Sequence, residues 1–165
     1  MNIVKKITLA TLALSMMFVV SCEDSGSDPA TTGTLNLTIN LSNAEAWPSD
    51  GTVFVSMDKN WPPTGAPYKS TVVTSSQVQN GALNVTFEDL DFDSYALASI
   101  SWMDPNDTNP QTNQHIWGTH SGNMFASTGQ FIFYADAIPF TLSQDMDTLS
   151  LVISATVSTG QGGAQ

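Results

Sequence analysis

One loop of this chain carries oxygen-bearing side chains at spacings that could hold a metal ion. Within six positions it presents two carboxylates and two amides, those of Asp104, Asn106, Asp107 and Asn109. Ca²⁺ prefers hard oxygen ligands of this kind, so a structural calcium ion is one interpretation. The loop is not an EF-hand, because Asn109 stands where the sixth position needs glycine and His115 where the twelfth needs glutamate. Asp and Asn beside proline also form ordinary turns, so a loop without any cofactor is the other interpretation.

A second acidic series, Asp89, Asp91 and Asp93, has the same two interpretations. Its alternation could bring carboxylates together around a cation, or could serve only to keep a loop in water. Since the spacing favours neither, both stay open.

Few residues could build a catalytic site. A metal-dependent hydrolase would need His115 and His120 to share a metal ion with Asp104. On a strand, residues five apart point to opposite faces, so the two histidines do not chelate a metal by themselves. Residues 118–122 have the outline of a hydrolase nucleophile elbow but carry His120 where the serine must stand. We therefore expect no enzymatic activity, with the metal-dependent hydrolase as the alternative.

Tryptophans offer a different chemistry, that of ligand binding. Trp47 and Trp61 stand beside prolines in turn-rich segments. An exposed indole there could stack on a sugar ring or contact a protein partner, which makes these two the candidate ligand-binding residues. Loop tryptophans can also pack back over the edge of a sandwich. Trp102 lies in an apolar run and is expected in the core, and Trp117 is expected to be half-buried.

Composition limits what such sites could bind. The chain has 165 residues, four lysines, no arginine and fifteen acidic residues, for a formal net charge of −11. Nucleic-acid binding depends on Lys and Arg neutralising phosphates, so no nucleic-acid partner is expected. The length fits one domain, and a single cysteine, Cys22, cannot form an internal disulfide.

The elements that must position these residues are strands. Apolar and polar residues alternate with a period of two in four segments, residues 35–41, 52–58, 83–87 and 148–157. Residues 95–103 are apolar on both faces, as expected for a central strand, and shorter candidates lie at 70–74, 114–118 and 131–134. Turn formers separate these runs, and no window has a helical stripe. The sequence therefore predicts an all-β domain, an antiparallel β-sandwich of about seven or eight strands.

The N-terminal segment has the features of a processing signal. Lys5 and Lys6 precede a largely apolar run at 7–20, which is shorter than the ~20 residues of a membrane-spanning helix. The run ends in Val19, Val20, Ser21 and Cys22, which resembles the lipobox of bacterial lipoproteins. The resemblance implies cleavage before Cys22 and acylation of its thiol. Removal of residues 1–21 would leave two lysines against fifteen acids, a formal charge of −13, so the lipid rather than basic residues would hold the protein on a membrane.

These features predict four parts of the chain. They are a cleaved lipoprotein signal peptide at 1–21, a flexible acidic tether at 22–32, the β-sandwich at 33–157 and a disordered tail at 158–165. The acidic residues that follow Cys22 are similar to the surface-export signal of Bacteroidetes-type lipoproteins, with a solvated linker as the alternative. The expected location is the cell envelope, at the outer membrane.

A second resemblance concerns residues 85–97. They are similar to the strand-turn-strand motif F-x-x-L-P-x-G-x-Y-x-L of prealbumin-like sandwiches, the transthyretin and carboxypeptidase-regulatory type, an Ig-like architecture. Leu90 and Tyr95 keep their places, whereas Asp91 stands where proline is usual and Asp93 where glycine is usual. Aspartate tolerates left-handed turn geometry, and Tyr95 fits a tyrosine-corner role with its hydroxyl bonded back to the turn backbone.

Together these observations predict a non-catalytic lipoprotein of the cell envelope, whose β-sandwich acts as a binding or accessory module. Its expected partners are the membrane, through a lipid on Cys22, and a glycan or an envelope protein. The alternatives are a glycan-binding surface lipoprotein that uses its loop tryptophans, and the metal-dependent hydrolase. The fold itself favours none of these, because β-sandwiches carry many functions.

Overall fold

The computed structural model describes residues 29–109, 112–122 and 137–159. These residues form strands and two single-turn 3₁₀ helices. In chain order the elements are β1 (Gly33–Ser42), η1 (Ala44–Ala46), β2 (Thr52–Asp58), β3 (Lys69–Val73), η2 (Ser75–Gln77), β4 (Ala82–Leu90), β5 (Ser94–Tyr95), β6 (Leu97–Met103), β7 (Gln114–Thr119), β8 (Phe140–Thr141) and β9 (Thr148–Thr156). In the described part of the chain, no helix is long and apolar enough to cross a membrane.

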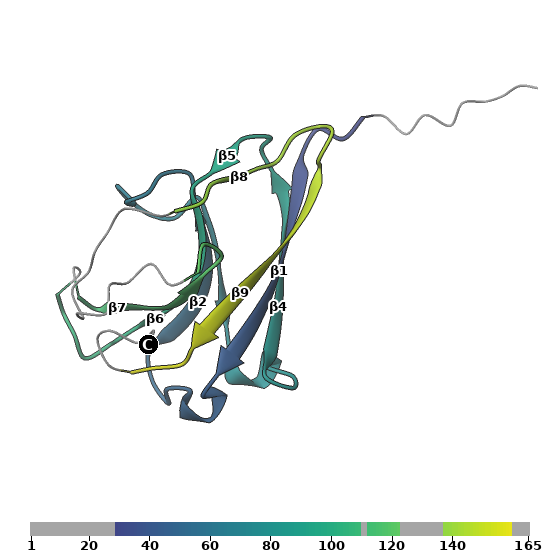
Figure 1. Ribbon diagram of the computed structural model, residues 1–165. Helices are drawn as coiled ribbons and strands as arrows, with labels where there is room; N and C mark the ends of the chain where they lie inside the picture. Colours follow the sequence, from purple (N-terminus) through teal and green to yellow (C-terminus); the bar gives the residue numbers. More distant parts are fainter. Residues whose placement is uncertain (1–28, 110–111, 123–136, 160–165) are drawn as a thin grey trace, which may run out of the picture.

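The strands form two facing layers (Figure 1). One sheet has the order β4-β1-β9, the other the order β3-β2-β6-β7, and a short β5-β8 pair lies at one end. The predicted all-β sandwich is confirmed. All strand pairs given by the described residues are antiparallel except one, because β9 runs parallel to β1.

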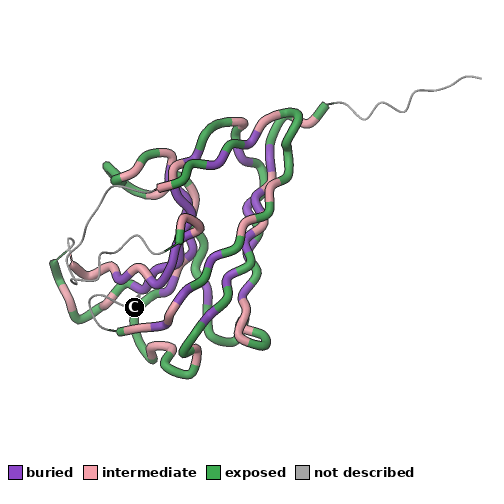
Figure 2. The backbone as a smooth tube through the Cα atoms, viewed as in Figure 1, coloured by how far each residue is buried: buried purple, intermediate pink, exposed green. Residues whose placement is uncertain are grey.

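Alternation along each strand builds the core between the layers. In β1, Leu35, Leu37 and Ile39 are buried, whereas the residues between them lie on the outer side. The same pattern in β4 and β2 places Leu83, Val85, Phe87, Val53, Val55 and Met57 in one continuous cluster. Figure 2 shows this alternation of buried and exposed positions along the chain.

The central strand β6 is buried on both faces, as its sequence predicted. From Leu97 to Trp102 each residue is buried, and Ala98, Ile100 and Trp102 join the core. The alternate positions, Ser99 and Ser101, face the other side of the sheet and are also buried. Strand β6 therefore fixes the register of its neighbours, because β2 and β7 both pair with it.

The two sheets meet closely where β7 approaches β9. A Cβ atom at Gly118 would lie 2.4 Å from the Ser154 carbonyl oxygen, closer than any side chain allows. Beside it, the fully buried Trp117 donates its indole N–H to the Ser158 carbonyl oxygen at 2.8 Å. The expectation that Trp117 is half-buried is thus wrong, because a bulge opposite Ile100 and Ser101 in the β6–β7 ladder accompanies its inward position.

The turn at residues 91–95 has the expected tyrosine corner. The Tyr95 hydroxyl donates to the Asp91 carbonyl oxygen at 2.7 Å, and both Tyr95 and Leu90 are fully buried. The left-handed residue of this region is Asp89, with φ of 54°, rather than Asp93. The carboxylate of Asp93 instead accepts the N–H of Ser94.

One strand was not predicted from the sequence, and several predicted features lie outside the described residues. The strand β8 was not among the predicted strands, since two residues are too short for a periodic pattern. Cys22, residues 1–28 and the candidate strand at 131–134 lie outside the described residues.

Asn80, with φ of 52°, and Gly81, with φ of 75°, form the tight turn that leads into β4.

Candidate functional site

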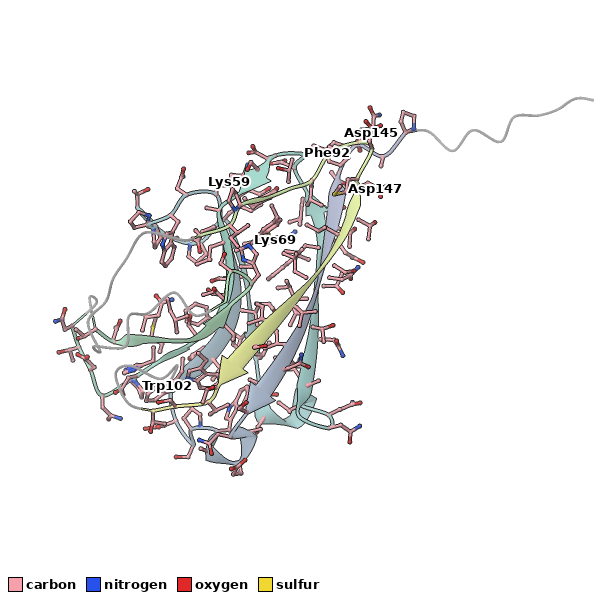
Figure 3. The ribbon with its side chains drawn as sticks, in the orientation of Figure 1. Lys59, Lys69, Phe92, Trp102, Asp145 and Asp147 are labelled. Atoms are coloured by element: carbon pink, nitrogen blue, oxygen red, sulfur yellow. The ribbon has the colours of Figure 1, made fainter. Side chains whose placement is uncertain are left out.

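The described ion pairs of the domain gather at one end of the sandwich. We call this cluster of Lys59, Tyr68, Asp91, Asp93 and Tyr95 the Lys59 corner. Lys59 and Phe92 lie at the end of the molecule where the N-terminal segment enters, and Trp102 lies toward the opposite end (Figure 3).

Two loops and one short strand supply these side chains. Lys59 follows directly after β2, and Tyr68 directly precedes β3, so the hairpin between those strands presents both. Asp91 and Asp93 belong to the turn between β4 and β5, and Tyr95 ends β5. Because β4 and β2 belong to different sheets, the cluster links the two layers.

Lys59 is the centre of the cluster. Its Nζ lies 3.1 Å from Asp91 Oδ2 and 2.9 Å from Asp93 Oδ2. The Tyr68 hydroxyl donates to the same Asp91 oxygen at 2.8 Å, and Lys59 Nζ stands 4.3 Å from the centre of the Tyr68 ring. The Tyr95 ring contacts the Tyr68 ring, with the two ring centres 5.4 Å apart. The ammonium thus touches two carboxylates and an aromatic face at once.

This arrangement keeps its groups charged. The hydrogen bond from Tyr68, then that from Lys59, lowers the pKa of Asp91. Hydrogen bonds from Lys59 and from the Ser94 N–H lower the pKa of Asp93. The two carboxylates in turn raise the pKa of Lys59. The pKa of each of these two carboxyls is thus shifted away from neutral pH, whereas a general acid or base needs a pKa shifted toward it.

The corner is open to solvent. The side chains of Asp91 and Asp93 keep 65% and 48% of their surface exposed, and Tyr68 lies at the rim. Lys69 is the second cation of the described chain, and its Nζ donates to the backbone carbonyl oxygen of Glu88. A partner would therefore meet carboxylate oxygens and a phenol ring, with the two lysines already engaged.

The predicted calcium loop is organised as turns. Asp104 Oδ1 accepts the N–H of Asn106 at 2.8 Å, and Asp107 Oδ1 accepts the N–H of Asn109 at 2.8 Å. The second oxygen of Asp107 accepts the Thr112 hydroxyl at 2.6 Å, which together with the Asn109 N–H lowers the pKa of Asp107. Throughout the described ranges, no group of three or more His, Cys, Asp or Glu side chains is placed to hold a metal ion. The calcium ion stays a prediction.

The histidines occupy separate places. His120 Nδ1 accepts the Ala98 N–H at 3.0 Å, so its Nε2 carries the proton and donates to the Ile138 carbonyl oxygen at 2.6 Å. His115 is buried in β7, and the centre of its ring lies 5.1 Å from that of the Trp102 ring. The Ser121 hydroxyl accepts the Ile138 N–H at 2.9 Å. His120 and Ser121 thus both hydrogen-bond to the backbone of Ile138, two residues before β8, and hold it at the end of β7. In the described residues, His115, His120 and Asp104 do not come together as a metal site.

The loop tryptophans differ in their surroundings. Trp47 is half-buried, and its ring meets that of Trp117 edge-on at 5.1 Å and 77°. Trp61 is also half-buried, and in the sequence it follows Lys59 by two residues. Trp102 is in the core, as expected, and donates its indole N–H to the Asp50 carbonyl oxygen at 2.9 Å.

Sequence reasoning named Asp91 and Asp93 but missed their partners Lys59 and Tyr68. The available signal was the scarcity of lysine, since Lys59 and Lys69 are the two cations that follow Cys22. A cation kept in so acidic a chain, directly after a half-buried strand, indicates a specific carboxylate partner. Which carboxylate it contacts depends on the pairing of the sheets.

Comparisons with known proteins place this chain in no family. No family model matches it, and no curated protein matches it. Among solved structures, that of BcpA*(D312A), the major pilin subunit of Bacillus cereus, superposes with a TM-score of 0.34 at 17% sequence identity. The match covers 76% of this chain and 30% of that chain. Similarity at this level defines neither a family nor a function.

Proposed function

We propose that this chain is a non-catalytic binding protein of the bacterial cell envelope, held at the outer membrane by lipid on Cys22. The observation that carries the binding role is the Lys59 corner. Its carboxylates and lysine hold one another in their charged forms, and its rim is exposed. Such preorganised ions position a partner, whereas acid-base catalysis needs a group that gains and loses protons near neutral pH.

The anchoring role rests on the N-terminal sequence. Lys5 and Lys6, the apolar run at 7–20 and the Val19-Val20-Ser21-Cys22 ending stand in the order that the bacterial lipoproteins use. Acyl chains contribute about 0.8 kcal/mol for each buried CH₂, so several chains on one cysteine hold a domain firmly on a membrane. An anionic surface repels a strongly anionic domain, so lipid rather than basic residues would hold the domain there.

The connection between anchor and domain limits how far the domain lies from the membrane. Seven peptide steps separate Cys22 from Pro29, the first described residue, and an extended chain of that length reaches about 25 Å. The entry point lies at the end of the sandwich that carries Asp145 and Asp147, with Lys59 and Phe92 toward the same end (Figure 3). In this proposal the Lys59 corner lies toward the end of the domain that is joined to the anchor, and the broad faces of the sandwich stay accessible from the flanks.

Two substitutions in the N-terminal segment test the anchor. Cys22→Ser removes the thiol, so the protein should leave the membrane fraction and should no longer incorporate radiolabelled palmitate. Ser21→Ala keeps a small residue before the cysteine, so it should stay in the membrane and keep the label. Retention of Cys22→Ser in washed membranes would overturn the anchoring proposal.

The binding role needs its own experiment. The full chain would be cross-linked in intact cells and its partners compared with those of Asp91→Asn/Asp93→Asn, which removes both charges without changing side-chain volume. Loss of a captured envelope component from the variant supports the corner as a contact site. An identical pattern from both chains would overturn that assignment while leaving the anchor untouched.

A further inference from the structure

The outer face of the β4-β1-β9 sheet consists almost wholly of hydroxyl and amide side chains. In Figure 1 this sheet is the right-hand layer, and the face in question points away from the other sheet. We call it the amide-hydroxyl face. Its members are Thr34, Asn36, Thr38, Asn40 and Ser42 of β1, Asn84 and Thr86 of β4, and Thr148, Ser150, Ser154 and Thr156 of β9. Val152, Ala82 and Glu88 complete it, with Asp89 beside Glu88 at the bulge that ends the alternation of β4.

Strand register places these groups in rows across the sheet. Asn36 pairs with Thr86 on one side and with Ser150 on the other, and Thr38 pairs with Asn84 and with Val152. Neighbouring strands lie about 4.8 Å apart, and alternate residues of one strand about 6.7 Å apart. The face is therefore a regular array of polar groups on a three-stranded sheet, with its members exposed or half-buried (Figure 2).

Cross-strand hydrogen bonds fix the central side chains. The Thr86 hydroxyl donates to Asn36 Oδ1 at 2.8 Å, and the Thr38 hydroxyl donates to Asn84 Oδ1 at 3.1 Å. Each amide uses its oxygen within the sheet, which leaves the NH₂ group of Asn36 and Asn84 for an outside acceptor. Held in this way, the array loses little conformational entropy when a ligand binds.

The face is nearly neutral in a strongly anionic protein. Fifteen acidic residues and four lysines give the chain its charge of −11, and two of those acids, the exposed Glu88 and Asp89, lie at one end of this face, where β4 bulges. Neither described lysine lies on it, because Lys59 follows β2 and Lys69 belongs to β3. A neutral partner fits such a surface, since an anionic polymer would be repelled by the rest of the molecule and a cationic one finds too few carboxylates there.

The chemistry of the face also selects the partner. Hydroxyl and amide groups both donate and accept hydrogen bonds, as the hydroxyls of a sugar do. A second copy of the chain is a poor occupant, because stacking two such faces would remove many polar groups from water and bury Val152 as the single large apolar side chain. A protein partner is also a poor occupant, because this face lacks the large apolar side chains that carry most of the energy of protein interfaces.

We infer that the amide-hydroxyl face binds a neutral polysaccharide, which lies along the sheet and hydrogen-bonds to successive rows. Many weak contacts along one polymer add up through multivalency, so the face needs no deep pocket. This inference rests on the proposed role as a binding module, and it moves glycan recognition from the loop tryptophans to the sheet.

A pull-down of the full chain in detergent micelles tests the inference. The probes are microcrystalline cellulose, insoluble xylan and insoluble β-1,3-glucan, with the anionic polymer alginate, as calcium-set beads, for comparison. The test variant is Asn36→Asp/Asn84→Asp, in which the new carboxylates still accept the Thr86 and Thr38 hydrogen bonds while the outward NH₂ donors are lost. Asn60→Asp/Gln144→Glu adds the same charge at exposed positions off this face and serves as the matched control. Urea unfolding of both variants checks that the fold is kept.

The expected result is retention on at least one neutral polysaccharide and none on alginate. The bound fraction should fall at least fivefold in Asn36→Asp/Asn84→Asp, and should be unchanged in the control and in Trp61→Ala. Absence of binding to all three neutral polymers, or equal binding by the test variant, overturns the inference. Loss of binding in Trp61→Ala alone overturns it in favour of the loop tryptophan. A partner captured at the Lys59 corner would leave the broader binding function standing in each of these cases.

Discussion

The Tyr95 hydroxyl donates a 2.7 Å hydrogen bond to the backbone carbonyl oxygen of Asp91, four residues before it in the chain. The ring is fully buried and stacks on Phe140, with ring centres 5.5 Å apart, so the bond ties the turn to the short β5-β8 pair. The carboxylate of the same Asp91 points outward and binds Lys59 and Tyr68. One residue thus joins the folding of the turn, through its backbone, to the charge of the surface, through its side chain.

Removal of the Tyr95 hydroxyl should destabilise the domain. Tyr95→Phe keeps the ring and leaves the Asp91 carbonyl oxygen without its partner, which should lower the free energy of unfolding by about 1–2 kcal/mol. Tyr68→Phe removes a solvent-exposed hydroxyl and should have the smaller effect. Urea unfolding followed by tryptophan fluorescence measures both. Equal stabilities for wild type and Tyr95→Phe would show that water replaces this bond at no cost.

Lys59 should control the titration of the corner. In Lys59→Met the carboxylates lose their cation, so the pKa of Asp91 and of Asp93 should rise, as followed by NMR of the carboxyl carbons. Lys69→Met is the control, because Lys69 donates to the Glu88 backbone, and it should leave both pKa values in place. Since folding lowers these pKa values, their contribution to stability is present above the ordinary aspartate range and is lost as the pH falls through the folded values. Unmoved pKa values in Lys59→Met would contradict the ion pairs.

Asp58 should make the fold less stable as the pH rises. It is 8% exposed at the end of β2, on the outer side of the second sheet opposite Leu97, and burial raises its pKa to about 6. Between about pH 4 and pH 6 the folded state therefore binds more protons than the unfolded state, so the free energy of unfolding falls as the pH rises through that window. Above it the full cost of the buried charge is present.

The isosteric variant Asp58→Asn tests this relationship. At pH 7.5 it should unfold with a free energy about 1–2 kcal/mol higher than wild type, a value reduced from the full shift for partial solvation, and the gain should vanish near pH 4. Asp145→Asn, at an exposed turn, should change stability by less than about 0.5 kcal/mol at either pH. A gain of equal size at both pH values would mean that charge on Asp58 is not the cause.

The contact between β7 and β9 should tolerate no side chain at position 118. A Cβ at Gly118 would lie 2.4 Å from the Ser154 carbonyl oxygen and 2.8 Å from the Ala155 backbone, so Gly118→Ala should cost about 2–4 kcal/mol by forcing the sheets apart. Gly65→Ala is the matched control, because no atom lies within 4 Å of its added Cβ. Thermal unfolding compares the two variants. A Gly118→Ala protein as stable as Gly65→Ala would show that the sheets separate freely at this edge.

The pattern of side chains along the chain was enough to predict the elements and their faces. Alternation marked β1, β2, β4 and β9, because a strand with one buried face must place apolar residues at every second position. The apolar run of β6 marked the central strand, since a strand covered on both faces has no polar side. The motif around Leu90 and Tyr95 was local, so the hydroxyl-to-backbone bond within the turn could also be predicted.

Tertiary structure decided which distant residues meet. Lys59 and Asp91 are 32 positions apart, and their contact depends on which strand ends the fold brings together. The parallel pairing of β1 with β9 depends on the same choice. It places Ser150 and Val152 beside Asn36 and Thr38, and so turns three separate polar alternations into one continuous amide-hydroxyl face. Sequence periodicity is a property of one strand, whereas a site made by several strands exists only after their order and register are set.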